Sequence, residues 1–161
     1  MKYKFFAATV IISFCIFSCN SSNDKKVKEE KKGSAIDGTW ELVSSERNSK
    51  FSHPMRSPSQ LKMFNDGWFS FMMYNDSGNF YYAGAGPFEL KDNMYKETFR
   101  YSSDTTYINW KDWQKWEMKG DTLIFYGFEK VENPNGKEIT ADWNRKGTFI
   151  EKRVRVKNII F

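Results

Sequence analysis

The stretch from Tyr95 to Tyr101, YKETFRY, places one carboxylate among aromatic residues. Successive side chains of a strand alternate between two faces, so Tyr95, Glu97, Phe99 and Tyr101 are expected to share one. An aromatic face is expected to point inward, where a lone charge is costly unless it is paired or protonated. Glu97 therefore has an internal Arg or Tyr partner, awaits a polar group of a ligand, or lies near the mouth of an interior space. With a neighbouring Tyr it could also act in general acid–base chemistry, although nothing in the spacing favours that over binding.

Other catalytic arrangements are hard to assemble from this sequence. His53 is the single histidine, which excludes the usual His pairs of zinc sites and the multi-His iron sites. A haem-binding barrel would need a His on a late strand, and a Ser–His–Asp set would depend on His53 in a Pro-rich connection. We therefore expect no metal and no cofactor, and favour a binding protein over an enzyme.

The two cysteines lie early in the chain and suggest a different chemistry. A basic MKYK precedes an apolar run that ends at Ser18. This run is shorter than the roughly 20 residues that span a bilayer, and it is typical of a secretory signal peptide. Ile16 and Ser18, before Cys19, resemble the lipobox of bacterial lipoproteins, with Phe17 an imperfect match. The resemblance implies cleavage before Cys19, its lipidation, and a lipid-anchored place in the bacterial envelope, on the periplasmic or surface face of the outer membrane.

A disulfide, a metal site of Cys15 with Cys19, and an ordinary signal peptide cut elsewhere are the alternatives. Either pairing would need both cysteines in the mature chain, whereas Cys15 is expected to leave with the leader. We therefore expect a signal peptide over residues 1–18. Residues 19–35 would be the lipidated Cys19 and a flexible, charged tether, too polar to bury the surface that ordering requires.

The charge of the remaining chain is nearly balanced. The formal net charge is +5, from 25 basic and 20 acidic residues. Much of the excess precedes Ile36, in Lys2, Lys4 and the lysine-rich tether. A protein that binds nucleic acid needs a basic face to displace counterions. The sequence shows no such face, so no nucleic-acid partner is expected.

From residue 36 to residue 161 the pattern is one of short strands. Aromatic residues make up 18% of the chain, and they favour pleated, half-buried surfaces. Turn sequences separate the strands, at Asn65-Asp66-Gly67, Asp76 to Asn79, Lys91-Asp92-Asn93, Lys119-Gly120-Asp121 and NPNGK. Asp104 to Lys111 is expected to be a loop or a short helical turn. About eight antiparallel strands in sequence predict an all-β, up-and-down barrel, because closure removes the open edges.

Gly38-Thr39-Trp40 resembles the Gly-X-Trp signature that begins the first strand of lipocalin-like barrels. Together with GAGPFEL, YKETFRYSSD and KGDTLIF, it is similar to a bacterial lipocalin-like domain of unknown function, of the calycin type, over about Ile36 to Lys157. The resemblance implies that Trp40 packs across the closed end of the barrel, beneath Arg153 or Arg155 of the last strand. The roles of these residues and of Gly38 would then be structural.

An eight-stranded barrel either fills with side chains or holds one small ligand. The run Ala83 to Gly86, AGAG, leaves room for a cavity, although glycines in a strand equally mark a bend or a close approach. We expect a monomer that binds a small hydrophobic or amphipathic ligand inside. The alternatives are a filled barrel that docks on an envelope protein and, third, an enzyme that uses Glu97. The candidate ligand contacts are Trp68, Tyr82, Tyr95, Glu97, Phe99, Tyr101 and Trp116.

Overall fold

The computed structural model describes residues 33–48, 50–52 and 59–157. The expected signal peptide, Cys15, Cys19 and His53 lie outside these residues. The strands are β1 (Gly38–Arg47), β2 (Lys50–Ser52), β3 (Gln60–Asn65), β4 (Trp68–Tyr74), β5 (Phe80–Lys91), β6 (Met94–Thr98), β7 (Tyr101–Ser102), β8 (Lys111–Lys119), β9 (Thr122–Glu132) and β10 (Phe149–Arg155). The helical turns are η1 (Thr105–Tyr107), α1 (Thr140–Trp143) and η2 (Asn144–Lys146). In the part of the chain described, no helix is long and apolar enough to cross a membrane.

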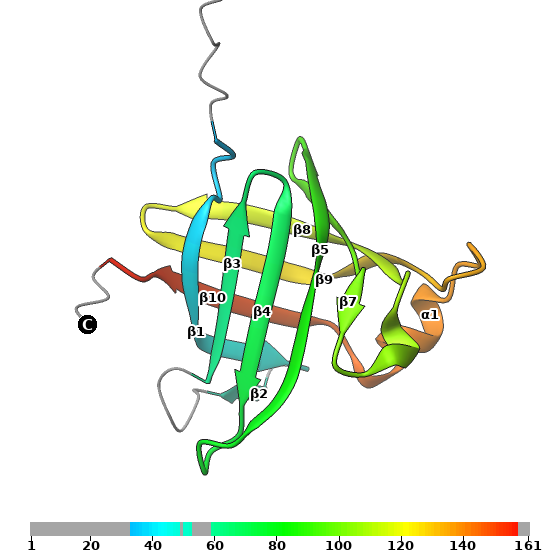
Figure 1. Cartoon of the computed structure of the whole chain (residues 1–161), viewed down its shortest axis with the longest axis horizontal. Coiled ribbons are helices and arrows are strands. Elements are labelled where there is room, and N and C mark those ends of the chain that lie inside the picture. Colours follow the sequence, from blue (N-terminus) through cyan, green and yellow to red (C-terminus); the bar gives the residue numbers. More distant parts are fainter. Residues whose placement is uncertain (1–32, 49, 53–58, 158–161) are drawn as a thin grey trace, which may run out of the picture. The chain divides into compact units, whose positions relative to one another are not determined.

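Eight of the strands close into an antiparallel barrel, which confirms the predicted fold class. They follow the order β1-β3-β4-β5-β6-β8-β9-β10, and β10 pairs with β1 to close the ring. The short strands β2 and β7 attach to β1 and β5. In Figure 1, β3, β4 and β5 pass in front of β8, β9 and β10 and cross them at a wide angle. This architecture is consistent with a lipocalin-like fold.

The predicted hairpin turns are also confirmed. The chain reverses at residues 65–68, 75–79, 91–94 and 119–122, each between two paired strands. Asp66 and Gly67 both have positive φ, 48° and 79°, which is why this two-residue turn takes an Asp-Gly pair. The expected helical turn within residues 104–111 is η1. Helix α1, after the NPNGK turn, was not predicted.

The barrel interior is filled at one end. Five large side chains there are at most 2% exposed, and ring pairs such as Phe64–Tyr95 and Tyr95–Phe125 meet at centroid distances of 5.8 and 5.0 Å. Burial of rings of this size gives the closed fold much of its stability. We call this set the filled end: Trp40, Phe64, Tyr95, Leu123 and Phe125.

The AGAG run serves close packing rather than a cavity. A Cβ at Gly86 would collide with the backbone carbonyl of Thr98. After Thr98 the chain leaves the β6 line and passes over this glycine, and the Arg100 N–H donates to the Ala85 carbonyl at 2.9 Å. This crossing breaks the expected alternation of YKETFRY. Tyr101 is therefore 67% exposed, and its predicted place on the inward face is wrong.

Candidate functional site

A layer of buried polar side chains lies inside the barrel, next to the filled end. At its centre the Lys62 Nζ lies 2.6 Å from Glu97 Oε2, and the Tyr95 hydroxyl donates to the same oxygen. The side chains of Lys62 and Glu97 are 8% and 5% exposed. Glu97 thus has an internal Tyr partner, as one of the expected alternatives proposed, together with a Lys. We call this set the polar layer: Gln60, Lys62, Glu97, Asp112, Gln114 and Arg153.

Aromatic rings of the filled end and of β4 surround the ammonium of Lys62. Its Nζ lies 5.0–5.6 Å from four ring centroids. A cation is attracted to ring faces at such distances, and more strongly where water is excluded. Four rings and one carboxylate thus hold the buried charge, the rings being Phe64, Phe69, Tyr95 and Phe125.

Asp112 lies directly across from Glu97, on the neighbouring strand β8. Burial raises the pKa of Asp112 well above its usual range, and the nearby charge of Glu97 raises it further. The Gln114 Nε2 donates to Asp112 Oδ1 at 2.7 Å, which partly opposes the shift. The pair therefore combines one carboxylate that has a Lys partner with one carboxyl group that favours its protonated form.

The Asp112→Asn variant is expected to be more stable than the wild type at pH 8. Because the folded protein holds the Asp112 proton more tightly than the unfolded chain does, wild-type stability should fall as pH rises from about 4 through the raised pKa. Asn cannot ionise and still accepts from Gln114, so the advantage should vanish towards pH 4. Urea unfolding across this pH range measures the difference in stability between the variant and the wild type.

Asp121→Asn is the control. It should be less stable than the wild type at pH 8, because the hydrogen bond from Lys157 lowers the pKa of Asp121 and stabilises its charged form in the folded protein. Identical pH profiles for wild type and Asp112→Asn would contradict the expectation.

Two cavities adjoin the polar layer. The larger cavity has a volume of about 550 Å³ and the smaller one about 400 Å³, within the range of small-molecule sites. Each residue of the polar layer lines one or both, whereas those of the filled end line neither. Six residues line both cavities, which makes them neighbouring parts of one site: Tyr81, Tyr82, Glu97, Phe99, Phe128 and Trp143.

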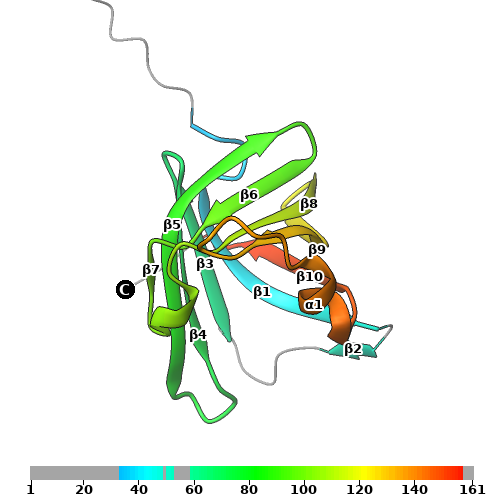
Figure 2. The ribbon, with the colours of Figure 1, turned by 90° about the vertical axis from the view of Figure 1, so that its right-hand side faces the viewer.

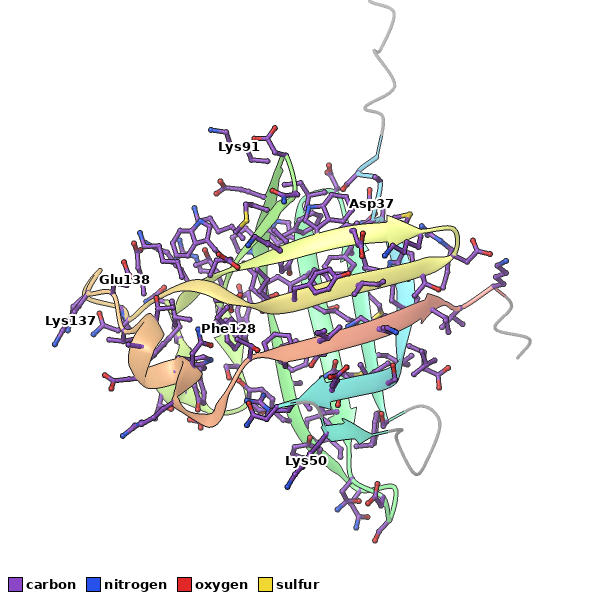
Figure 3. All side chains as sticks on the ribbon, turned by 180° about the vertical axis from the view of Figure 1, so that it is seen from behind. Asp37, Lys50, Lys91, Phe128, Lys137 and Glu138 are labelled. Atoms are coloured by element: carbon purple, nitrogen blue, oxygen red, sulfur yellow. The ribbon has the colours of Figure 1, made fainter. Side chains whose placement is uncertain are left out.

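Six rings that line the larger cavity form the aromatic wall of this site: Tyr82, Phe99, Tyr107, Trp110, Phe128 and Trp143. Trp143 of α1 contacts Tyr107, Trp110 and Phe128 at centroid distances of 5.8, 5.1 and 5.9 Å. Tyr107 in turn contacts Tyr82 of β5 at 6.3 Å. Figure 3 shows Phe128 on β9 next to α1, and Figure 1 shows α1 and β7 on the same side of the barrel, the side that faces the viewer in Figure 2. Apolar, aromatic walls of this kind suit a partly apolar ligand.

The structure brings together three of the predicted ligand contacts, Tyr82, Glu97 and Phe99, which line both cavities. The Ser102 hydroxyl donates to the Tyr82 hydroxyl at 3.3 Å, while burial raises the pKa of Tyr82. The other candidates lie elsewhere. Trp68 is 49% exposed and does not point into the barrel.

Of two further candidates, one is buried in the packed core and the other packs against that core, and neither lies at a cavity. Tyr95 is fully buried and reaches the site only through its bond to Glu97. Trp116 packs against the hydrophobic core and lines neither cavity. With Tyr101 already placed outside, four of the predicted contacts do not line the site: Trp68, Tyr95, Tyr101 and Trp116.

The closed end of the barrel has the expected arrangement around Trp40. The Trp40 indole N–H donates to the Ile36 carbonyl at 2.7 Å, and the Arg155 guanidinium lies 4.3 Å from the centre of its ring. Gly38 has φ +133°, and a Cβ there would collide with Arg155. A glycine two residues before the Trp is therefore required for this stacking. Arg153 does not share the role, because it belongs to the polar layer.

Sequence reasoning missed Lys62 and most of the aromatic wall. In the strand QLKMFN, alternation equally allowed Leu61 and Met63 to face inward. The pattern therefore did not indicate that Lys62 is buried. Tyr107, Trp110 and Trp143 lie in or next to short helical turns, and only the folded chain brings them together. The expected loop or short helical turn at Asp104 to Lys111 gave no indication of a shared site.

Comparisons with known proteins add little to this geometry. No protein family matches the chain, and no curated protein does. A solved structure of an uncharacterised protein from Bacteroides eggerthii is similar over 73% of this chain and 98% of that one, with 16% identity and a TM-score of 0.44. Among the described residues no group of three or more His, Cys, Asp or Glu side chains is arranged to hold a metal ion. The cavities and the polar layer are therefore the features of this chain that bear on its function.

Proposed function

We propose that the barrel binds one small, partly apolar ligand in the two adjoining cavities. The observation that carries this proposal is that only one end of the interior is filled, while the other leaves cavities of about 550 and 400 Å³. The apolar part of the ligand would lie between Tyr82, Phe99, Phe128 and Trp143. The polar layer would meet its polar end.

Binding of N-phenyl-1-naphthylamine, a neutral aromatic dye that fluoresces when it leaves water, tests this proposal. We expect saturable fluorescence enhancement with one dye per chain, and displacement of the dye by decanol. Trp143→Ala should weaken dye binding about tenfold or more, because removing a Trp that packs on a ligand can cost about 1.4 kcal/mol or more of binding energy.

Trp113→Ala is the matched control. Trp113 lies on β8 outside both cavities, where the ammonium groups of Lys96 and Lys130 lie 5.5 and 4.8 Å from its ring centroid. This variant should bind the dye as the wild type does. Absence of saturable binding to the folded wild type, or equal losses in the two variants, would argue against a ligand site in the barrel.

We further propose that the chain is anchored in the bacterial envelope through lipid on Cys19. The support is the sequence Ile16 to Cys19, which lies outside the described residues. Labelling of cells with radioactive palmitate should mark the wild-type protein and leave the Cys19→Ala variant unlabelled. Equal labelling of both would place the lipid elsewhere, and no labelling of either would refute the anchor.

A protein-interaction module remains the second candidate function, and one observation favours it. A groove of about 420 Å³ on the outer face of β4 and β5 is lined by Met72, Ala83, Ala85, Tyr101 and Ile108, among others. Exposed apolar surfaces of this kind can mark docking sites. If envelope proteins crosslink to the protein through a photoreactive residue at position 101, and the dye does not bind, this function is the better one.

A further inference from the structure

Arg153 is a buried cation whose hydrogen-bonding capacity is only partly used. The residue is 2% exposed. Its Nη2 donates to Gln60 Oε1 and, at 2.6 Å, to Glu151 Oε2. Its Nε and Nη1 are buried and have no hydrogen-bond partner. A guanidinium stays charged at any ordinary pH, and buried donors without acceptors are costly, so this group is suited to a further acceptor.

The second arginine of the strand provides a contrast. The guanidinium of Arg155 stacks on Trp40 and donates to the Asp37 carbonyl at 2.5 Å. It has a structural role at the closed end. Arg153, two residues earlier on the same strand, lines the smaller cavity instead. The two free nitrogens therefore belong to a side chain beside the proposed ligand site, and not to the support of Trp40.

The charges around the smaller cavity favour an anion. Its lining includes the cations Arg47, Lys62 and Arg153 and the carboxylates Glu97 and Glu151. Lys62 already pairs with Glu97. Glu151 pairs with Arg153 through a single nitrogen, and its side chain is 28% exposed, so it leaves the other nitrogens of Arg153 free. The cationic excess thus lies on the side of Arg153 and Arg47.

We propose that Arg153 binds the carboxylate of an amphipathic ligand whose apolar part lies along the aromatic wall. This inference rests on the proposed function and names the class of ligand, a small apolar carboxylic acid. Guanidinium and carboxylate are matched in shape and charge, and their hydrogen bonds are stronger than neutral ones. The two cavities share Phe99, Phe128 and Trp143, so one molecule can contact both Arg153 and the wall.

A matched pair of probes, decanoate and decanol, tests the inference in competition with N-phenyl-1-naphthylamine. At pH 8 decanoate should displace the dye from the wild type at about tenfold lower concentration than decanol, as expected for a charge-assisted hydrogen bond. Equal potency of the two would overturn the role of Arg153 and leave the binding function intact. Displacement by neither would overturn both.

Three variants test whether the preference for decanoate depends on Arg153. Arg153→Gln should remove the advantage of decanoate over decanol. Lys152→Gln, which removes the same charge from the exposed neighbour on β10, should keep the advantage. Glu151→Gln should strengthen decanoate binding about threefold or more, because it removes a repelling carboxylate that competes for the same guanidinium. A preference for decanoate that survives in Arg153→Gln, or a loss in Glu151→Gln, would contradict the inference. Should Arg153→Gln not fold, the wild-type comparison and Glu151→Gln still decide it.

Discussion

The Glu97→Gln variant is expected to lose about 3–5 kcal/mol of unfolding free energy, because it leaves a buried ammonium without its anion. Lys62 and Glu97 are almost fully buried, and their charged atoms lie 2.6 Å apart. Gln can still accept the Tyr95 hydroxyl bond, but it carries no charge to offset that of Lys62. Urea unfolding followed by tryptophan fluorescence measures the loss, and the Tm should fall by about 10 °C or more.

Two controls separate this effect from the mere loss of a carboxylate. Glu89→Gln makes the same change in a pair with Lys96 at 3.0 Å, where Glu89 is 71% exposed. That variant should lose about 1 kcal/mol or less. The double variant Lys62→Met/Glu97→Gln removes both charges and should recover most of the stability. A Glu97→Gln protein as stable as the wild type would instead assign Glu97 as a carboxylate held under strain for a ligand.

Sequence reasoning predicted best those features that are determined by neighbouring residues. The Asp66-Gly67 turn needs positive φ at two adjacent positions, and few residue pairs accept this. Turn constraints of this kind predicted the hairpins, and the hairpins in turn predicted the closed sheet. The closed end was predicted from the resemblance of Gly38-Thr39-Trp40 to the lipocalin-like signature, since the arginine that Gly38 and Trp40 both contact lies far along the chain.

Prediction failed where the decisive partner lies far along the chain. In the sequence, Tyr101 has the same parity as Glu97 and Phe99. The chain crosses over Gly86 after Thr98, however, and this crossing places the Tyr101 side chain on the outside. Lys62 lies in a strand of mixed pattern, and the carboxylate that makes its burial tolerable is 35 residues away. Three rings of the aromatic wall, Tyr107, Trp110 and Trp143, lie in or next to helical turns that come together only in the folded barrel. The fold could therefore be derived from the sequence, but the site could be derived only in part.

Truncation of Trp40 to Ala is expected to cost about 3–5 kcal/mol of unfolding free energy. The side chain is fully buried, so its removal leaves a cavity at the closed end and deprives the Ile36 carbonyl of its donor. It also removes the ring on which Arg155 stacks, a contact of about 1–2 kcal/mol where water is excluded. Chemical denaturation of the purified variant measures the sum.

Trp68→Ala is the matched control for Trp40→Ala, since it removes the same side chain from a half-exposed position on β4. It should cost about 1 kcal/mol or less. Because Trp40 lines neither cavity, the fraction of Trp40→Ala protein that remains folded should bind N-phenyl-1-naphthylamine with wild-type affinity. A folded Trp40→Ala variant that had lost the dye would place the ligand at the closed end of the barrel. A Trp40→Ala variant that lost no more stability than Trp68→Ala would mean that the barrel does not depend on its stacked indole, because the filled end would then have collapsed to close the cavity.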